Sequence, residues 1–190
     1  MSGPIKVNDY RDVSIFLNSI VPLNVTIESP DLYFQTIENE DIVHCCWLYR
    51  GLKQPAEIVK KVNKWIKRWA NSNPFSVFVV SNRKTDEFLG YIGLNKKNKL
   101  IVTLFGCGHS YQWKEFGLEA TIAITHYMQW IRDVLKVSVP PMIQAKAKRY
   151  NFLSRNILEK AGMILTVKDK EDYHYSCSTE SKTNEEEDIL

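Results

Sequence analysis

Apolar residues recur along the chain with two different periods, which separate the expected helices from the expected strands. Between residues 55 and 70 they return every three or four positions, which is the spacing of a helix with one buried face. Pro55 suits the first turn of that helix, because this position needs no backbone N–H donor. From residue 75 to residue 107, three apolar runs are separated by short polar segments, a pattern typical of strands joined by turns.

The same two periods predict an order of elements for the whole chain. An apolar cluster at residues 13–17 predicts a short helix or loosely packed chain within an N-terminal extension, residues 1–22. A strand, two helices, a three-strand meander, a long helix, a strand, a helix and two strands follow. The expected helices cover residues 39–53, 55–70, 115–135 and 151–161, and the expected strands cover residues 31–36, 75–80, 88–94, 100–107, 142–147, 163–167 and 173–177.

The segment from residue 151 to residue 163 carries the strongest local signals. Asn151 is able to cap a helix, because its side chain accepts hydrogen bonds from the free N–H groups of a first turn. Ile157, Leu158 and Ala161 form one apolar stripe, and Gly162 is a helix stop. We therefore expect a short capped helix that leads directly into a strand.

Composition excludes several classes of protein. With 190 residues, 44% of them hydrophobic and 25% charged, the chain is long enough for one globular domain. It has no apolar run of membrane-spanning length, and its first residues lack the apolar block of a signal peptide. No C-x-x-C spacing occurs, so we expect a cytoplasmic protein without a metal site, with reduced thiols at Cys45, Cys46, Cys107 and Cys177.

Charge is distributed unevenly along the chain. The whole chain carries +3, but residues 179–190 hold five acidic residues and one lysine, which leaves +7 for residues 1–178. A basic body suits an anionic ligand such as a nucleotide, a phosphorylated cofactor or RNA. The acidic segment predicts a disordered tail, residues 179–190.

The expected helix over residues 55–70 combines aromatic and basic residues. Trp65 and Trp69 fall on its apolar stripe, whereas lysines and one arginine occupy the other face. Aromatic and basic side chains together are able to bind single-stranded RNA. Because the tryptophans share the apolar stripe, the pattern favours core packing, and it leaves the lysines to attract an acidic substrate or ribosomal RNA.

Asn151 and Ser154 begin a motif, Asn-x-x-Ser followed by Leu-Glu-Lys-x-Gly and a hydrophobic residue, that resembles the coenzyme A-side helix of GNAT-fold N-acetyltransferases. The sequence looks most like the ribosomal-protein N-terminal acetyltransferase (RimJ/RimL-like) branch, which acetylates protein N-termini and certain small amines. The order of elements also matches this fold over residues 30–178. The resemblance implies an α+β fold with α/β/α layers, in which a mixed, mostly antiparallel central sheet of about seven strands is flanked by about four helices. The implied domain covers residues 23–178.

In GNAT proteins the segment between the fourth strand and the long helix cradles the pyrophosphate of acetyl-CoA, since N–H groups at a helix start and the helix dipole favour an anion. Family members carry Gln/Arg-x-x-Gly-x-Gly/Ala there, often followed by Glu-Ala. The resemblance aligns Glu119 and Ala120 with the Glu-Ala pair and places Glu115 at the first motif glycine. The implied cofactor-binding residues of this segment are Gln112, Trp113, Lys114, Glu115, Phe116 and Gly117.

Glu115 departs from the motif, because it adds bulk and negative charge where a glycine allows close approach to the phosphates. Like-charge repulsion there would cost about 1 kcal/mol near the surface and several times more in a desolvated site. Two outcomes remain open. Glu115 points away from the phosphates, its backbone N–H still donating and Lys114 offsetting its charge, or the cofactor site is weakened.

The resemblance also assigns a role to the strand over residues 100–107. The backbone of Phe105, Gly106 and Cys107 would pair with the pantetheine arm of acetyl-CoA like an added strand. Many relatives carry a general-base glutamate early in this strand, where the present chain has Val102 and Thr103. That base is therefore absent from this position.

The implied catalytic residues are His109, Tyr111 and Ser154. A neutral histidine beyond the strand would be able to accept a proton from an amine, and an ordinary loop residue is the alternative for His109. The resemblance gives Asn151 a contact with the pantetheine and gives Ser154 the protonation of the departing thiolate. Many GNAT enzymes use a tyrosine four residues later, where this chain has Leu158, so Ser154 or a water must serve. The cofactor's adenine or 3′-phosphate end would meet Lys160 and Arg155, unless these two belong to a solvated helix face.

These features imply an acetyl-CoA-dependent N-acetyltransferase in which a primary amine, from a protein N-terminus or a small molecule, attacks the thioester directly. The fold would position the reactants and polarise the carbonyl through its backbone. The expected partner is the amine substrate, with no membrane, no nucleic acid except indirectly through the ribosome, and a monomeric or homodimeric protein. The alternative, favoured by Glu115 and by the missing strand glutamate, is a degenerate GNAT domain that acts as a coenzyme A-binding sensor or as a protein or RNA interaction module.

Overall fold

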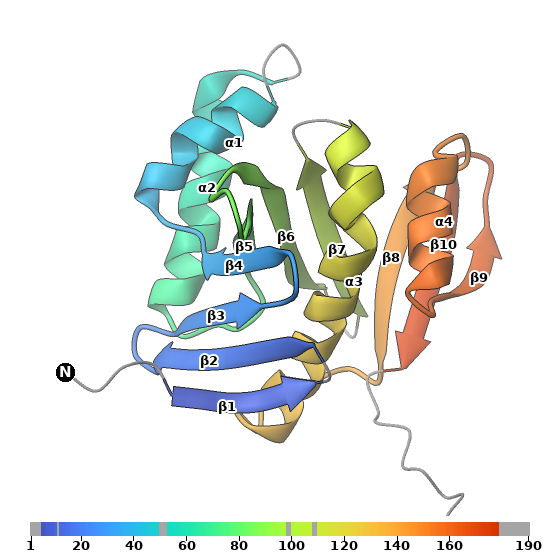
Figure 1. The fold of residues 1–190 in the computed structure, drawn as a ribbon. Coiled ribbons are helices and arrows are strands. Elements are labelled where there is room, and N and C mark those ends of the chain that lie inside the picture. Colours follow the sequence, from blue (N-terminus) through green and yellow to red (C-terminus); the bar gives the residue numbers. More distant parts are fainter. Residues whose placement is uncertain (1–4, 11, 50–52, 98–99, 108–109, 179–190) are drawn as a thin grey trace, which may run out of the picture.

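Ten strands form one sheet in a computed structural model that describes residues 5–10, 12–49, 53–97, 100–107 and 110–178 (Figure 1). The strand order is β1-β2-β3-β4-β5-β6-β7-β8-β10-β9, and neighbouring strands are antiparallel except for β7 and β8, which are parallel. The strands are β1 (Ile5–Tyr10), β2 (Val13–Ser19), β3 (Asn24–Glu28), β4 (Leu32–Thr36), β5 (Val77–Asn82), β6 (Phe88–Lys97), β7 (Leu100–Cys107), β8 (Met142–Lys148), β9 (Ile164–Lys168) and β10 (Asp172–Ser178).

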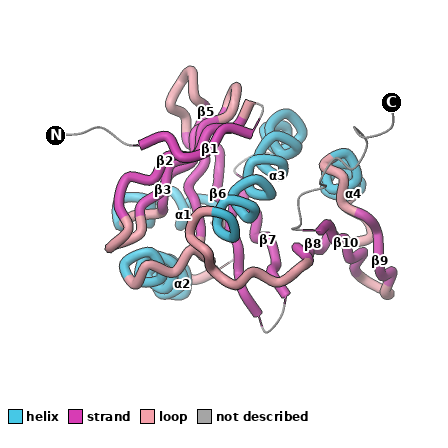
Figure 2. The backbone as a smooth tube through the Cα atoms, turned by 90° about the horizontal axis from the view of Figure 1, so that it is seen from below, coloured by secondary structure: helices cyan, strands magenta, loops and turns pink. Residues whose placement is uncertain are grey.

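Helices cover both faces of this sheet. Helices α3 and α4 lie over one face, and α2 lies over the other with α1 packed against it (Figure 2). The helices are α1 (Ile42–Leu48), which follows a 3-10 turn at Asn39–Asp41, α2 (Pro55–Ala70), α3 (Ser110–Asp133) and α4 (Phe152–Lys160). The α+β class, the layered arrangement and the mostly antiparallel sheet are therefore confirmed. The sheet is larger than expected, because three strands precede β4, the first strand that the sequence predicted.

The N-terminal segment corrects one prediction. Residues 13–19 form a strand, not a short helix or loosely packed chain, and β2 pairs with both β1 and β3. Val13 and Ile15 are buried and alternate with half-buried residues, which is the two-residue period of a strand with one face on the core. The apolar density of this segment suggested a helix, whereas its alternation carried the correct signal.

Helix α2 confirms the interpretation of its tryptophans. Trp65 and Trp69 are 3% and 4% exposed, and the Trp69 indole N–H donates to the carbonyl oxygen of Val77 at 2.8 Å. Pro55 occupies the first turn, as predicted. The apolar stripe of α2 therefore belongs to the core and offers no aromatic surface to RNA.

Two other helices differ from the predicted bounds. The helix expected over residues 39–53 is a 3-10 turn followed by a short α1 that ends at Leu48. Helix α3 begins at Ser110, five residues earlier than expected. Residues 110–116 contain neither glycine nor proline, so nothing in the local sequence opposes the helix there.

Candidate functional site

The parallel strands β7 and β8 separate part-way along their length. They pair at two positions, Ile101 with Ile143 and Val102 with Gln144. Beyond these positions β7 continues beside β6 and β8 continues beside β10, each to its carboxyl end. Among the described residues, 103–107 of β7 and 145–148 of β8 thus face each other without pairing, and we call this divergence the β7–β8 fork (Figure 1). In open parallel α/β sheets, ligands commonly bind in the crevice where neighbouring strands diverge at their carboxyl ends, and β7 and β8 form such a pair here.

Phe105, Gly106 and Cys107 lie on the β7 side of the fork. All three pair with β6, so β7 is hydrogen-bonded along one edge in this region. Backbone groups on its other edge are free to bind an extended ligand as an added strand would. The structure therefore puts these residues where the sequence expected them, and their contact with a cofactor stays a prediction.

Two helices begin beside the fork. Helix α3 follows β7, α4 follows β8, and the two helices pack against each other. A helix start carries unsatisfied N–H groups and a partial positive charge, so each start favours an anion. The fork thus combines free strand edges with two positively polarised helix ends (Figure 1).

The expected phosphate-binding segment is helical throughout, which corrects the prediction that the long helix begins at residue 115. Tyr111, Gln112, Trp113, Lys114 and Glu115 all belong to the first two turns of α3. In a helix that starts at Ser110, the free N–H groups belong to the first turn, and later N–H groups bond within the helix. His109 lies outside the described residues. The last two members of the segment are the half-buried Phe116 and the buried Gly117, whose carbonyl oxygen accepts from the Thr121 hydroxyl at 2.7 Å.

Asn151 caps α4 as predicted. Its Oδ1 accepts a hydrogen bond from the backbone N–H of Ser154 at 3.0 Å. Ser154 itself is half-buried in the first turn of α4. Gly162, with φ of +81°, follows the end of the helix in the left-handed conformation that favours glycine. Lys160 occupies the last turn of α4, about 12 Å along the axis from the capped end.

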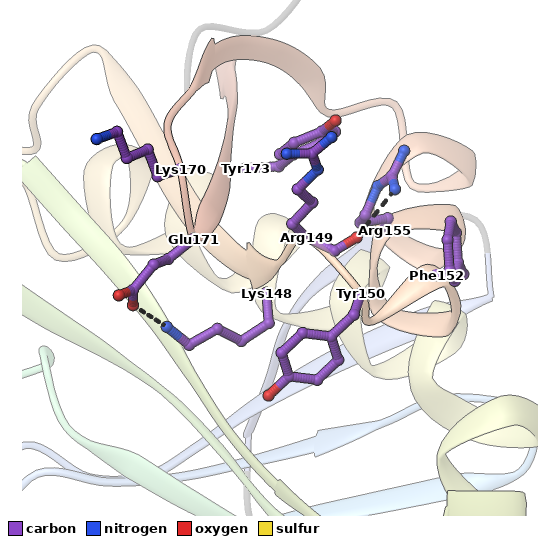
Figure 3. A pocket seen from close by; sticks show the side chains of 8 residues that line it. All are labelled: Lys148, Arg149, Tyr150, Phe152, Arg155, Lys170, Glu171 and Tyr173. Carbon is purple, nitrogen blue, oxygen red and sulfur yellow. Dashed lines mark hydrogen bonds and ion pairs between the residues drawn. The ribbon is translucent and has the colours of Figure 1, made fainter.

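A cavity of about 740 Å³ opens at the carboxyl end of β8 (Figure 3). Arg155 crosses one wall: its guanidinium lies 4.3 Å from the Tyr173 ring centroid and donates to the Arg149 carbonyl oxygen at 3.2 Å. Lys148 bonds Glu171 at 3.0 Å across the other wall. The lining residues come from the β8–α4 connection, from α4 and from the β9–β10 connection: Lys148, Arg149, Tyr150, Phe152, Arg155, Lys170, Glu171 and Tyr173.

Of this cavity, the sequence singled out Arg155 alone. The missed signal is the pair of basic runs at residues 146–150 and 168–170. The antiparallel pairing of β8 with β10 and of β10 with β9 brings the ends of these runs together. Neither run is informative until that pairing is known.

A hydroxyl cluster lies on the other side of the fork, on the face that α1 and α2 cover. Tyr91 of β6 pairs with Gly106 of β7, and its hydroxyl hydrogen-bonds the hydroxyl of Tyr49. The Lys61 ammonium donates to the Tyr49 oxygen at 2.8 Å and lies 4.8 Å from the ring centroid of Trp65. Burial, followed by the hydrogen bond to Tyr49, raises the pKa of Tyr91 well above its ordinary value. This shift favours the neutral phenol of Tyr91 over its phenolate.

The sequence model of the family described as "Acetyltransferase (GNAT) domain" matches residues 21–164. The chain belongs to the GNAT acetyltransferase family. Members of this family use acetyl-CoA as cosubstrate. The fork fits that molecule, because it offers a free strand edge to an extended arm and two helix starts to anionic groups.

Solved structures share the GNAT fold at low sequence identity. A GNAT-family acetyltransferase from Bacillus anthracis superimposes with a TM-score of 0.64 at 18% identity, covering 82% of this chain and 99% of its own. A ribosomal-protein-S5-alanine acetyltransferase from Vibrio fischeri gives 0.62 at 14% identity, covering 81% and 96%. A spermidine N-acetyltransferase chimera, derived in part from Vibrio cholerae, gives 0.59 at 14% identity, covering 78% and 96%. No curated protein matches the sequence.

Two further observations bear on the expected partners. Within the part of the chain that the structure describes, no helix has the length and apolar character needed to cross a membrane. The same residues contain no group of three or more His, Cys, Asp or Glu side chains placed to share a metal ion.

Proposed function

We propose that the protein is an acetyl-CoA-dependent N-acetyltransferase that transfers the acetyl group to a primary amine by direct attack. The observation that carries this proposal is the β7–β8 fork with a helix start on each side. A free strand edge suits an extended amide-containing arm, and the helix starts suit a pyrophosphate. One surface thus matches both chemical parts of the cosubstrate.

In the proposed complex, the backbone of Phe105, Gly106 and Cys107 holds the pantetheine arm, and the first turn of α3 holds the pyrophosphate. Gln112 and Lys114 add polar and positive side chains in this region. The proposed segment at the start of α3 begins with Tyr111 and also includes Trp113, Phe116 and Gly117. Glu115 belongs to the same segment, where its negative charge opposes the phosphates at the position of the motif glycine.

The chemical step needs two proton transfers. The amine nitrogen attacks the thioester carbonyl carbon, the carbon–sulfur bond breaks, and the sulfur leaves as a thiolate that takes a proton. We assign that proton to the Ser154 hydroxyl at the start of α4, beside the Asn151 cap. The proton lost by the amine passes to His109 or to water, and the Ser154 oxygen regains a proton from water. The remaining catalysis comes from positioning and from backbone polarisation of the carbonyl.

The amine belongs to a protein N-terminus or to a small molecule, as in the ribosomal-protein N-terminal acetyltransferase-like branch. The similarity to an S5-alanine acetyltransferase and to a spermidine acetyltransferase is consistent with both classes, because the two share this fold. We further propose a cytoplasmic enzyme, monomeric or homodimeric, with its catalytic domain in residues 23–178.

Isothermal titration calorimetry with acetyl-CoA tests the proposal. We expect saturable one-to-one binding and, with a suitable amine, release of free coenzyme A that a thiol reagent detects. ADP serves as a control ligand: it should bind more weakly, because it lacks the arm that pairs with β7. Absence of acetyl-CoA binding would overturn the proposal.

A second function is favoured by the glutamate at the motif glycine and by Val102 and Thr103 at the place of the usual base. A degenerate domain would serve as a coenzyme A-binding sensor or as a protein or RNA interaction module. The two functions separate in one assay. A sensor binds acetyl-CoA but releases no coenzyme A with any amine, whereas an enzyme does both.

A further inference from the structure

The cavity at the end of β8 holds more positive than negative charge (Figure 3). Lys148 is neutralised locally, because its ammonium lies 3.0 Å from Glu171 and 3.2 Å from Asp172. Within the described ranges, no carboxylate lies at ion-pair distance from three other cations of the lining: Arg149, Arg155 and Lys170. The cavity therefore favours an anion and repels a polycation.

One of these cations is held rigidly. The Arg155 guanidinium lies over the rings of Tyr173, at 4.3 Å, and Phe152, at 5.2 Å, while it bonds the Arg149 backbone. A cation fixed before binding loses little side-chain entropy when a ligand arrives. Exposed aromatic rings border the same space, since Tyr150 is 76% and Phe152 71% exposed. The volume of about 740 Å³ lies in the range typical of sites for small ligands and short peptide segments.

The cavity lies on one side of the fork and the start of α3 on the other. Its described lining comes from segments attached to β8, β10 and β9, whereas α3 follows β7. Neighbouring strands are about 4.8 Å apart. A ligand group in the cavity is therefore separated from the proposed pyrophosphate position by the fork, where the thioester would lie. Such a group reaches the thioester from the β8 side.

We propose that this cavity binds an acidic group of the amine substrate, so that the preferred substrate is a peptide N-terminus followed by acidic residues. This inference rests on the proposed function. The three cations without an ion pair, Arg149, Arg155 and Lys170, would hold the carboxylates of the second and third residues of the peptide. The terminal amine of the peptide would then lie at the fork. A polyamine, or a peptide with basic residues in these positions, would be repelled.

Steady-state acetylation of three peptides tests the substrate class. The peptides begin with serine and continue with two glutamates, two glutamines or two lysines. We expect kcat/KM to fall by roughly tenfold or more at each step from glutamate to lysine, mainly through KM. The double variant Arg149→Glu/Lys170→Glu should reverse this order of preference. The control variant Lys96→Glu/Lys136→Glu makes the same change of net charge at exposed lysines outside the cavity and should preserve the order. Equal use of the three peptides by the natural protein would overturn the inference.

Two further measurements distinguish a peptide site from a cosubstrate site and separate this inference from the proposed function. Titration with acetyl-CoA and with its 3′-dephospho form tests whether the cations serve the cosubstrate. If the Arg149→Glu/Lys170→Glu variant loses affinity only for the 3′-phosphorylated form, the cavity is a cofactor-phosphate site and the inference is wrong. If no peptide is acetylated, direct binding of the fluorescein-labelled acidic peptide decides. Binding that the double variant weakens supports the inference even when the proposed function fails, and absence of binding refutes it.

Discussion

Replacing Asn151 separates its role as a helix cap from its proposed contact with the cosubstrate. In Asn151→Ala, α4 loses the 3.0 Å bond from Ser154 N–H to Oδ1. Loss of such a cap costs about 1 kcal/mol of the free energy of unfolding. The cost should appear in global unfolding, because α4 contributes the buried Ile157 and Leu158 to the protein interior. For a chain of this length, about 1 kcal/mol lowers the melting temperature by about 2–4 °C.

Asn151→Asp is the matched control, because aspartate keeps the capping oxygen and adds a favourable negative charge at the helix start. Its stability should equal or slightly exceed that of the natural protein. Its affinity for acetyl-CoA should nevertheless fall, since it lacks the amide N–H donor and carries a charge that opposes the phosphates. Urea denaturation followed by circular dichroism measures the first property, and calorimetry measures the second.

Two results would refute this account of Asn151. Unchanged stability of Asn151→Ala would show that the cap contributes nothing to folding. Unchanged acetyl-CoA affinity of Asn151→Asp would show that Asn151 is a cap only. In that case Asn151 would match the family motif in sequence without making the cosubstrate contact that the motif implies.

Four other substitutions test separate features. Ser154→Ala should leave the fold intact and lower turnover by roughly ten- to a thousandfold at unchanged acetyl-CoA affinity, as measured with a peptide amine; turnover at the natural rate would assign thiolate protonation to water. Glu115→Gly should tighten acetyl-CoA binding in calorimetry and, because the position is helical, lower stability by about 1 kcal/mol. Gly93→Ala should lower stability by about 1–3 kcal/mol in urea denaturation, because the added Cβ would overlap the Ser76 carbonyl oxygen. Hydrogen bonds from the His174 ring and from two backbone N–H groups lower the pKa of Asp169 below its ordinary value of 3.8. Asp169→Asn should therefore reduce the free energy of unfolding at neutral pH. The difference between variant and natural protein should vanish as the pH falls through the lowered pKa.

Local features were predictable from the sequence. The cap at Asn151, the stop at Gly162 and the core packing of Trp65 and Trp69 were all predicted and are all present. Each rests on groups within a few positions of one another, such as a side chain and an N–H three residues later. Short apolar runs bounded by polar segments also identified each strand from β4 onwards, because such a run predicts a strand regardless of which strand lies alongside.

Partner choice in the sheet was not predictable. For residues 13–17 the sequence predicted a short helix or loosely packed chain. A short apolar cluster is compatible with several structures until its backbone pairs with a neighbouring strand, as β2 pairs with β3. The start of α3 was placed too late for a related reason. The sequence there contains no breaker, and only the folded chain shows how far the helix extends towards β7.

By itself, the sequence determined the α+β class, the family motif at residues 151–162 and the short capped helix. Only the tertiary structure decided the fork, because the point at which β7 leaves β8 depends on how each strand pairs with its other neighbour. It likewise assembled the basic cavity from segments more than ten residues apart, through the pairing of β8 with β10. Helix caps and periodic stripes depend on neighbours along the chain, whereas sites depend on long-range pairing that no local pattern encodes.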